Sequence, residues 1–238
     1  MPMRAVYVET LIDAPMEQVW WATQDPTTHP RWDARFSSID PVPDSTPARF
    51  SYATRVLPAV RIGGYGVHAG ERTRPDGTRT SALRFGSDDP RSLIASGSGY
   101  WRYVPGPAGV RFLTGYTYAP RWGPLGRLAD LAFRPVFGWA TAWSFDRLRL
   151  WLEQGVPPER ALGNAAREVA LRTLAVAGVG ALAARVTDRT LAGALAVLAA
   201  TVVAMALPPH PHAPAARRCR RRPPDLLAAR PPSLLEKL

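Results

Sequence analysis

The first 155 residues alternate between apolar and polar positions in a way that predicts an antiparallel β-sheet. About seven runs rich in β-branched and aromatic residues are separated by turn-forming residues. These runs cover residues 3–11, 36–39, 50–57, 65–74, 78–85, 93–104 and 110–118. Short connections such as Pro75-Asp76-Gly77 are typical of hairpins, so consecutive runs are expected to pair antiparallel.

Helical spacing of apolar residues predicts three helices in the same region. Asp13 and Pro15 can begin a first helix, and Asp25-Pro26 can begin a second, shorter one. Residues 125–152 then carry a continuous apolar stripe that predicts one long helix. The sequence Gly155-Val156-Pro157-Pro158 ends this unit, so a first domain is expected over residues 1–155.

Two stretches carry a resemblance to a known superfamily. They are IDAPMEQVWWATQDPTTHPRWD at residues 12–33, and RFLTGYTY followed by WSFDRLRLWLE at residues 143–153. Together with the order of elements, they resemble the polyketide cyclase/dehydrase and lipid-transport branch of the START-like (SRPBCC) superfamily. The resemblance implies an α+β helix-grip fold, in which a curved antiparallel sheet surrounds a long C-terminal helix. It also implies a cavity for sterols, lipids, polyketides or other apolar molecules, and it carries over no catalytic residues.

Alternation along the strands predicts which side chains line such a cavity. Residues 110–118 place aromatic and hydroxyl side chains on one face, which suits a mostly apolar pocket with a few polar groups. Plain core packing is the alternative for the same residues. The predicted lining residues are Glu71, Leu83, Phe85, Trp101, Tyr103, Phe112, Thr114, Tyr116, Tyr118 and Phe137.

Glu71 is the one carboxylate among these candidates. It shares a strand face with Tyr65 and Val67, and an inward-facing carboxylate in apolar surroundings would have a raised pKa. An ion pair with a neighbouring arginine is the alternative. His68 falls on the opposite face and His29 lies at a helix end, so structural roles are expected for both, and the catalytic residues stay unknown.

Composition narrows the chemistry further. The net charge is +11, but the 30 basic residues are all arginine except Lys237 and most are scattered singly, so no nucleic-acid partner is expected. The single cysteine, Cys219, excludes an internal disulfide and a cysteine-based metal site. The four histidines lack metal-ligand spacing, and neither a metal nor a cofactor is expected.

The last third of the chain contains two uncharged apolar runs, at residues 173–184 and 191–207. The first is too short to cross a bilayer alone and the second is near the lower limit of length. Small residues recur every fourth position in both, as in helices that pack closely in lipid. We therefore predict a linker at 156–170 and a transmembrane helical hairpin at 171–207, with a soluble hairpin packed on protein as the alternative.

Residues 208–238, rich in proline and arginine, are expected to be disordered. Their basic cluster suits an anionic membrane surface, through Arg217, Arg218, Arg220, Arg221 and Arg222. Residues 1–9 contain no apolar stretch of the length of a secretory signal, and arginines are denser outside the hairpin than in its turn. We expect a location at the cytoplasmic membrane with both termini in the cytoplasm, or alternatively a soluble cytoplasmic protein.

Two ligand-binding functions remain open from the sequence, beside a third interpretation as an interaction module whose pocket is filled by its own aromatic side chains. The first is membrane-tethered binding or transfer of an apolar small molecule or lipid. The second is a polyketide cyclase or aromatase type of enzyme that acts on a ligand in the same cavity. The enzyme needs polar groups that converge inside the cavity, whereas the carrier does not.

Overall fold

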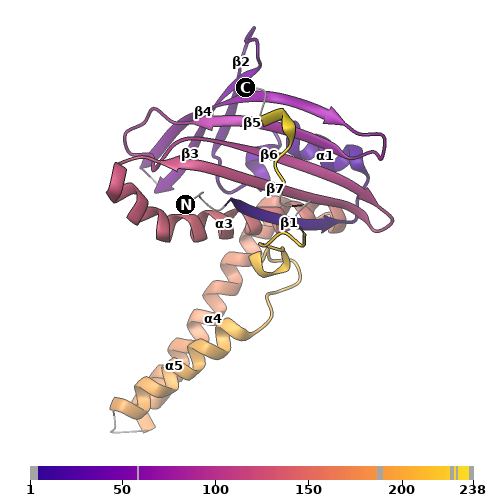
Figure 1. Ribbon diagram of the computed structural model, residues 1–238. Coiled ribbons are helices and arrows are strands. Elements are labelled where there is room, and N and C mark those ends of the chain that lie inside the picture. Colours follow the sequence, from indigo (N-terminus) through magenta and orange to yellow (C-terminus); the bar gives the residue numbers. More distant parts are fainter. Residues whose placement is uncertain (1–4, 58, 187–189, 226–227, 229, 236–238) are drawn as a thin grey trace. The chain divides into compact units, whose positions relative to one another are not determined.

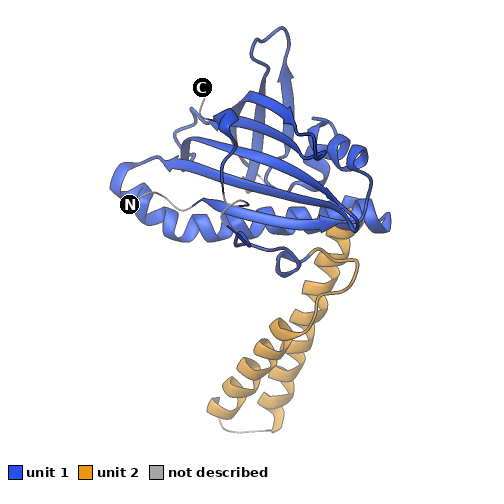
Figure 2. Cartoon of the chain, turned by 45° about the vertical axis from the view of Figure 1, so that its right-hand side comes forward, with its two compact units in different colours: residues 1–158, 215–238 blue, residues 159–214 orange. Residues whose placement is uncertain are grey.

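The computed structural model describes residues 5–57, 59–186, 190–225, 228 and 230–235. The chain forms two compact units (Figure 2). The first unit combines Met1–Pro158 with Ala215–Leu238, and the second is Glu159–Pro214. The last part of the chain therefore returns to the unit that its first part builds.

Among the described residues, seven strands of the first unit form one antiparallel sheet in the order β1-β7-β6-β5-β4-β3-β2. The strands are β1 (Val6–Ile12), β2 (Ser38–Val42), β3 (Arg49–Leu57), β4 (Val60–Thr73), β5 (Arg79–Gly86), β6 (Ile94–Gly106) and β7 (Gly109–Pro120). Six of them are consecutive hairpin neighbours, as the turn residues predict. The main difference from the expected bounds is at β4, which begins five residues earlier than Tyr65.

Helices α1 (Met16–Gln24) and α2 (His29–Trp32) connect β1 to β2, and α3 (Gly123–Gln154) follows β7. The sheet curves around α3 (Figure 1). Gly155 ends α3 in the left-handed conformation, with φ of 63°, which glycine adopts without steric cost. This arrangement confirms the predicted α+β helix-grip fold and, at the level of fold, the resemblance to the START-like superfamily.

Aromatic rings fill one end of the space between the sheet and α3. Phe112 of β7 stacks on Phe145 of α3 with ring centroids 4.4 Å apart. Tyr103 of β6 pairs with Phe112 across the strands, and the centroids of the two rings are 5.0 Å apart. Trp32 of α2 belongs to the same cluster. This end of the domain is a conventional close-packed core.

The described part of residues 208–238 that follows Ala215, for which disorder is predicted, contacts β1 and α3. Arg220 exchanges two backbone hydrogen bonds of 2.8 Å with Glu9 of β1, and Cys219 is buried. The buried carboxylate of Asp146 accepts hydrogen bonds from the Ala215 amide and the Arg218 guanidinium. Composition predicted disorder, but β1 is an edge strand, and this segment covers its open edge.

The second unit consists of α4 (Pro158–Val186) and α5 (Thr190–Ala206). Most of the predicted linker at 156–170 therefore belongs to a helix. Helix α4 is long and apolar enough to cross a membrane, and the residues of its apolar stretch are not buried. The apolar part of α5, Leu191–Ala206, is shorter. The predicted turn at 187–189 lies outside the described residues.

Helices α4 and α5 approach each other at a glycine. Gly180 of α4 approaches Val197 of α5, where an added methyl group would lie 3.1 Å from a valine methyl. At the other end of α5, Arg172 donates to the backbone carbonyl groups of Leu207 and Pro208 at 3.3 and 2.9 Å. Arg172 also donates to the backbone carbonyl group of Ala204, which lies in the last turn of α5, where a helix leaves carbonyl groups without partners of its own.

Candidate functional site: an apolar cavity with one polar cluster

A cavity of about 330 Å³ lies at the other end of the grip, between β3–β7 and α3. Its lining is mostly apolar and aromatic. Five of the predicted lining residues contribute to it: Leu83, Phe85, Trp101, Tyr116 and Phe137. The remaining five lie elsewhere.

Aromatic rings lie flat on the inner face of the sheet because glycines stand opposite them on the next strand. Tyr116 pairs with Gly99, and Phe85 pairs with Gly97. A methyl group at Gly99 would overlap the Tyr116 ring. The same relation joins Phe50 to Gly66 and Tyr52 to Gly64, and all four rings line the cavity.

Four of the other predicted residues are buried outside the cavity. Tyr103 and Phe112 belong to the filled core, and the Tyr103 hydroxyl hydrogen-bonds with Thr23 at 2.7 Å. Thr114 donates to the backbone carbonyl of Tyr100 at 2.8 Å. Tyr118 donates to Asp130 of α3 at 2.6 Å, and its burial raises its pKa.

Glu71 is exposed near the end of β4 and does not line the cavity. The pairing of β4 with β5 shifts between His68 and Gly70, and Gly70 has a φ of 124°. Such a bulge shifts the alternation of side chains for the residues that follow it. The cavity-lining Leu83 pairs with His68 before the bulge, so Tyr65 lies on the outer face of the sheet. After the bulge Glu71 pairs with Ser81, on the same face as Leu83 but outside the cavity.

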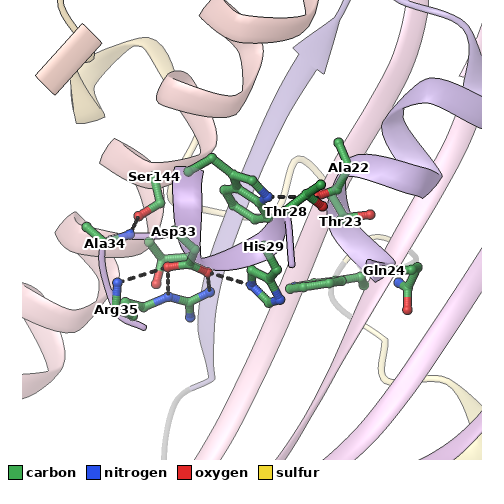
Figure 3. A network of polar contacts seen from close by, with 12 residues as sticks. Ala22, Thr23, Gln24, Thr28, His29, Asp33, Ala34, Arg35 and Ser144 are labelled. Carbon is green, nitrogen blue, oxygen red and sulfur yellow. Dashed lines mark hydrogen bonds and ion pairs between the residues drawn. The ribbon is translucent and has the colours of Figure 1, made fainter. Parts of the chain in front are cut away.

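A polar cluster that the sequence reasoning did not single out lies at the cavity wall (Figure 3). Asp33, at the end of α2, is fully buried and accepts two hydrogen bonds from the Arg35 side chain, at 2.9 and 2.6 Å. It also contacts His29 Nε2 at 3.1 Å. The Ser144 hydroxyl of α3 accepts a hydrogen bond of 3.0 Å from the Ala34 amide, which fixes this loop to the long helix.

Burial and charge set the protonation of this cluster. Burial alone would raise the pKa of Asp33, but the Arg35 guanidinium and the hydrogen bonds from His29 and Arg35 hold it well below its usual range. Burial lowers the pKa of His29, although Asp33 opposes that effect. At neutral pH the cluster therefore holds an ionised Asp33–Arg35 pair and a neutral imidazole, with no net charge.

Arg35 connects the cluster to the cavity. It lies over the rings of Tyr116 and Phe137, at 5.1 and 5.4 Å from its guanidinium carbon. Its Nη2 is 3.4 Å from the Tyr116 hydroxyl oxygen, which also accepts a hydrogen bond of 2.8 Å from Trp101 Nε1. The Tyr116 hydroxyl oxygen thus accepts from protein groups and donates to none of the described residues, so its own proton is available for a bound molecule.

The sequence did contain a signal for this cluster. His29 and Asp33 are one helical turn apart, and Arg35 follows two residues after Asp33. Three polar side chains beside a buried tryptophan indicate a buried network in which each polar group has a hydrogen-bond partner. The position of this cluster at the cavity wall depends on the packing of α2 near β6 and β7, which are distant from α2 in the sequence.

The described residues contain no group of three or more His, Cys, Asp or Glu side chains that could hold a metal ion.

No protein-family model matches the chain. Over 170 residues it is 44% identical to YndG of Bacillus subtilis (strain 168), an uncharacterized membrane protein. That alignment covers 69% of this chain and 63% of YndG. The chain thus spans less than two thirds of the length of that relative.

Solved structures with similar arrangements include a STAR-related lipid transfer protein from Xanthomonas axonopodis, with 19% identity and a TM-score of 0.48 over 63% of this chain and 86% of that one. A protein of unknown function, SA2116, from Staphylococcus aureus has 12% identity and a TM-score of 0.47 over 63% of this chain and 94% of that one. The di-domain ARO/CYC protein BexL has 18% identity and a TM-score of 0.41 over 57% of this chain and 42% of that one.

Proposed function

We propose that this protein binds an apolar molecule carrying one uncharged polar group in its helix-grip cavity, and that α4 and α5 hold it at a membrane. The observation that carries the proposal is a mostly apolar cavity of about 330 Å³ with a polar corner formed by Arg35 and Tyr116. Ligand sites are commonly concave and apolar with a few placed polar groups, and their volumes start at about 300 Å³.

The polar corner formed by Arg35 and Tyr116 favours a ligand with an uncharged oxygen that accepts hydrogen bonds. Arg35 uses Nε and Nη2 for Asp33, and among the described residues its Nη1 has no hydrogen-bond partner. A carbonyl or hydroxyl oxygen could accept from Nη1 or from the Tyr116 hydroxyl. A carboxylate is less suitable because Asp33 already neutralises the Arg35 charge.

The cavity opens toward an apolar surface. Val56 of β3 and Val136 of α3 both line it and are 56% and 61% exposed, so its mouth lies between these strand and helix positions. Along the same helix Leu128 and Trp139 are 64% and 50% exposed. An exposed apolar rim beside the mouth supports exchange of the ligand with a membrane rather than with bulk water.

Native mass spectrometry of the full chain, purified in mild detergent from its own host, tests the proposal most directly. A co-purifying apolar molecule is expected. Its oxygen content then tests the polar corner, because a hydrocarbon or a strong acid would contradict the inferred ligand chemistry.

A matched ligand pair measures the contribution of the polar corner. 2-Acetylnaphthalene and 2-ethylnaphthalene differ mainly in one carbonyl oxygen and can compete with an environment-sensitive dye. The acetyl compound should bind about tenfold more tightly, since a hydrogen bond to a charged donor contributes about 1.5 kcal/mol or more. Tyr116→Phe should reduce that preference, whereas Tyr118→Phe, on the same strand but outside the cavity, should keep it.

Membrane attachment is tested by fractionation of the full chain. Insertion of α4 and α5 should keep the protein in the membrane pellet in both high salt and carbonate. Attachment through Arg217, Arg218 and Arg220–Arg222 alone would fail in 1 M salt, where the screening length is about 3 Å. Both termini are proposed to lie in the cytoplasm, which accessibility of terminal tags to proteases in sealed vesicles can test.

One observation favours an enzyme as the second candidate. His29 lines the cavity as a neutral imidazole oriented by Asp33, which is the arrangement of a general base and its orienting carboxylate. A cyclase-type reaction on a bound polyketide would then lose turnover in His29→Gln while ligand binding remained. Unchanged turnover in this variant would exclude His29 as the base.

A further inference from the structure

A second cleft of about 540 Å³ lies on the outer face of the sheet, away from the cavity. Arg102 of β6 and Arg111 of β7 line this cleft. Each is the sequence neighbour of a residue that faces inward, Trp101 and Phe112 respectively, so the two arginines face outward. Arg74 enters from the turn between β4 and β5. Arg230 comes from the C-terminal segment, which lies over the sheet in Figure 1.

The two acidic residues that line the cleft, Asp76 and Asp225, and the nearby Glu9 all have partners within the protein. Asp76 accepts a hydrogen bond of 2.9 Å from the Thr78 amide, which holds the turn. Asp225 accepts one of 2.7 Å from the Ala228 amide. Glu9 pairs with Arg111 at 3.1 Å. Among the described residues, the side chains of Arg74 and Arg230 form no ion pair.

Arg102 is the buried member of the group, with 8% of its surface exposed. Its guanidinium carbon lies 4.9 Å above the Tyr100 ring, and its Nη2 donates to the backbone carbonyl of Arg230 at 3.0 Å. Burial lowers the pKa of Arg102, and the charge of Arg74 lowers it further. Two arginines that repel each other in a sheltered cleft would be stabilised by an anion between them.

We propose that this cleft binds a phosphoryl group, whose oxygens accept hydrogen bonds from Arg74, Arg102 and Arg230. Arginine guanidinium groups match the geometry of phosphate oxygens and remain charged at all physiological pH values. Val104 and Leu113 add apolar surface to the same cleft, so a substituent on the phosphoryl group has room beside them. The bound group would join the sheet to the C-terminal segment that supplies Arg230.

The test uses the full chain in neutral detergent, with thermal unfolding and calorimetric titration by inorganic phosphate against sodium chloride of equal ionic strength. The double variant Arg74→Gln/Arg230→Gln removes two exposed side chains and spares the buried Arg102. Arg49→Gln, an exposed arginine of β3 outside the cleft, is the matched control. Phosphate should raise the unfolding temperature of the wild type and the control, and the double variant should need at least about tenfold more phosphate for the same shift.

Three probes distinguish the source of the phosphoryl group: inorganic phosphate, glycerol 3-phosphate, and phosphatidic acid in phosphatidylcholine nanodiscs. A response greatest for phosphatidic acid and dependent on Arg74 and Arg230 identifies a lipid headgroup. A response greatest for a soluble probe, with the same dependence, identifies a free phosphate compound. No response to any probe, or equal responses in the double variant and the wild type, would overturn the proposal.

Discussion

The filled and open ends of the helix grip are built from the same strands but from different residue pairs. At the filled end, Tyr103 of β6 stands opposite Phe112 of β7, and the two rings stack into the space under α3. At the open end, Gly99 of β6 stands opposite Tyr116 of β7, and the ring lies across the glycine. A ring opposite a ring fills the interior, whereas a ring opposite a glycine covers the sheet and leaves volume above it.

This difference shows what side-chain alternation alone does not reveal. Alternation identifies inward-facing positions such as Phe112 and Tyr116 equally well. The cross-strand partner decides whether the side chain occupies the interior or lines it. Since the partner depends on strand register, the cavity is encoded in pairs of positions rather than in single residues.

Truncation of one ring at each end should give the largest contrast. Phe112→Ala removes a fully buried ring from a close-packed core and should lower the free energy of unfolding by about 3–5 kcal/mol. Phe85→Ala removes a half-buried ring that borders existing empty space, and about 1 kcal/mol is expected. Chemical denaturation of the full chain in detergent measures both, and equal losses would contradict the division into filled and open ends.

A single methyl group should close part of the cavity. In Gly99→Ala the new side chain overlaps the Tyr116 ring, which must move into the cavity. Dye binding should weaken by about tenfold or more, because overpacking costs about 1–3 kcal/mol. Gly106→Ala on the same strand meets no atom nearer than 3.6 Å and should bind dye as the wild type does. Unchanged dye binding in Gly99→Ala would show that the glycine is not needed to keep the space open.

The smallest expected effect is a pH dependence confined to the open end. The folded-state pKa of His29 lies below 6.5, so the unfolded chain takes up the proton first as the pH falls. The His29 contribution to stability is therefore complete above about pH 7 and is lost progressively below about pH 6.5. Asp33, whose pKa is also lowered, adds acid sensitivity only below about pH 4. Unfolding temperatures from pH 8 to pH 5 should fall less steeply in His29→Gln, and parallel slopes would contradict this assignment.

Much of the fold could be predicted because its signals are local. Turn residues such as Pro75-Asp76-Gly77 separate the strands, and the apolar stripe of residues 125–152 marks α3 within two residues at each end. The candidate site was predictable only in part. Tyr116 and Trp101 follow from alternation, but Glu71 lies near the exposed end of β4 and outside the cavity, because alternation does not show how far along the sheet the cavity extends.

The remaining features depend on contacts between distant segments. Nothing near Asp33 in the sequence indicates that Tyr116 lies beside its arginine partner, 81 positions after Arg35. Composition likewise predicts disorder for the arginine-rich end of the chain. Its order comes from the open edge of β1 and the buried carboxylate of Asp146, which are more than 70 residues away.

The return of the C-terminal segment has a consequence for biosynthesis. Synthesis proceeds from the N-terminus, so α4 and α5 are complete before residues 215–225 leave the ribosome. Until then β1 keeps an open edge, and Asp146 lacks the partners that Ala215 and Arg218 provide. The first unit therefore reaches its final state only after α4 and α5 have emerged, so the proposed delivery of these helices to a membrane would precede its completion.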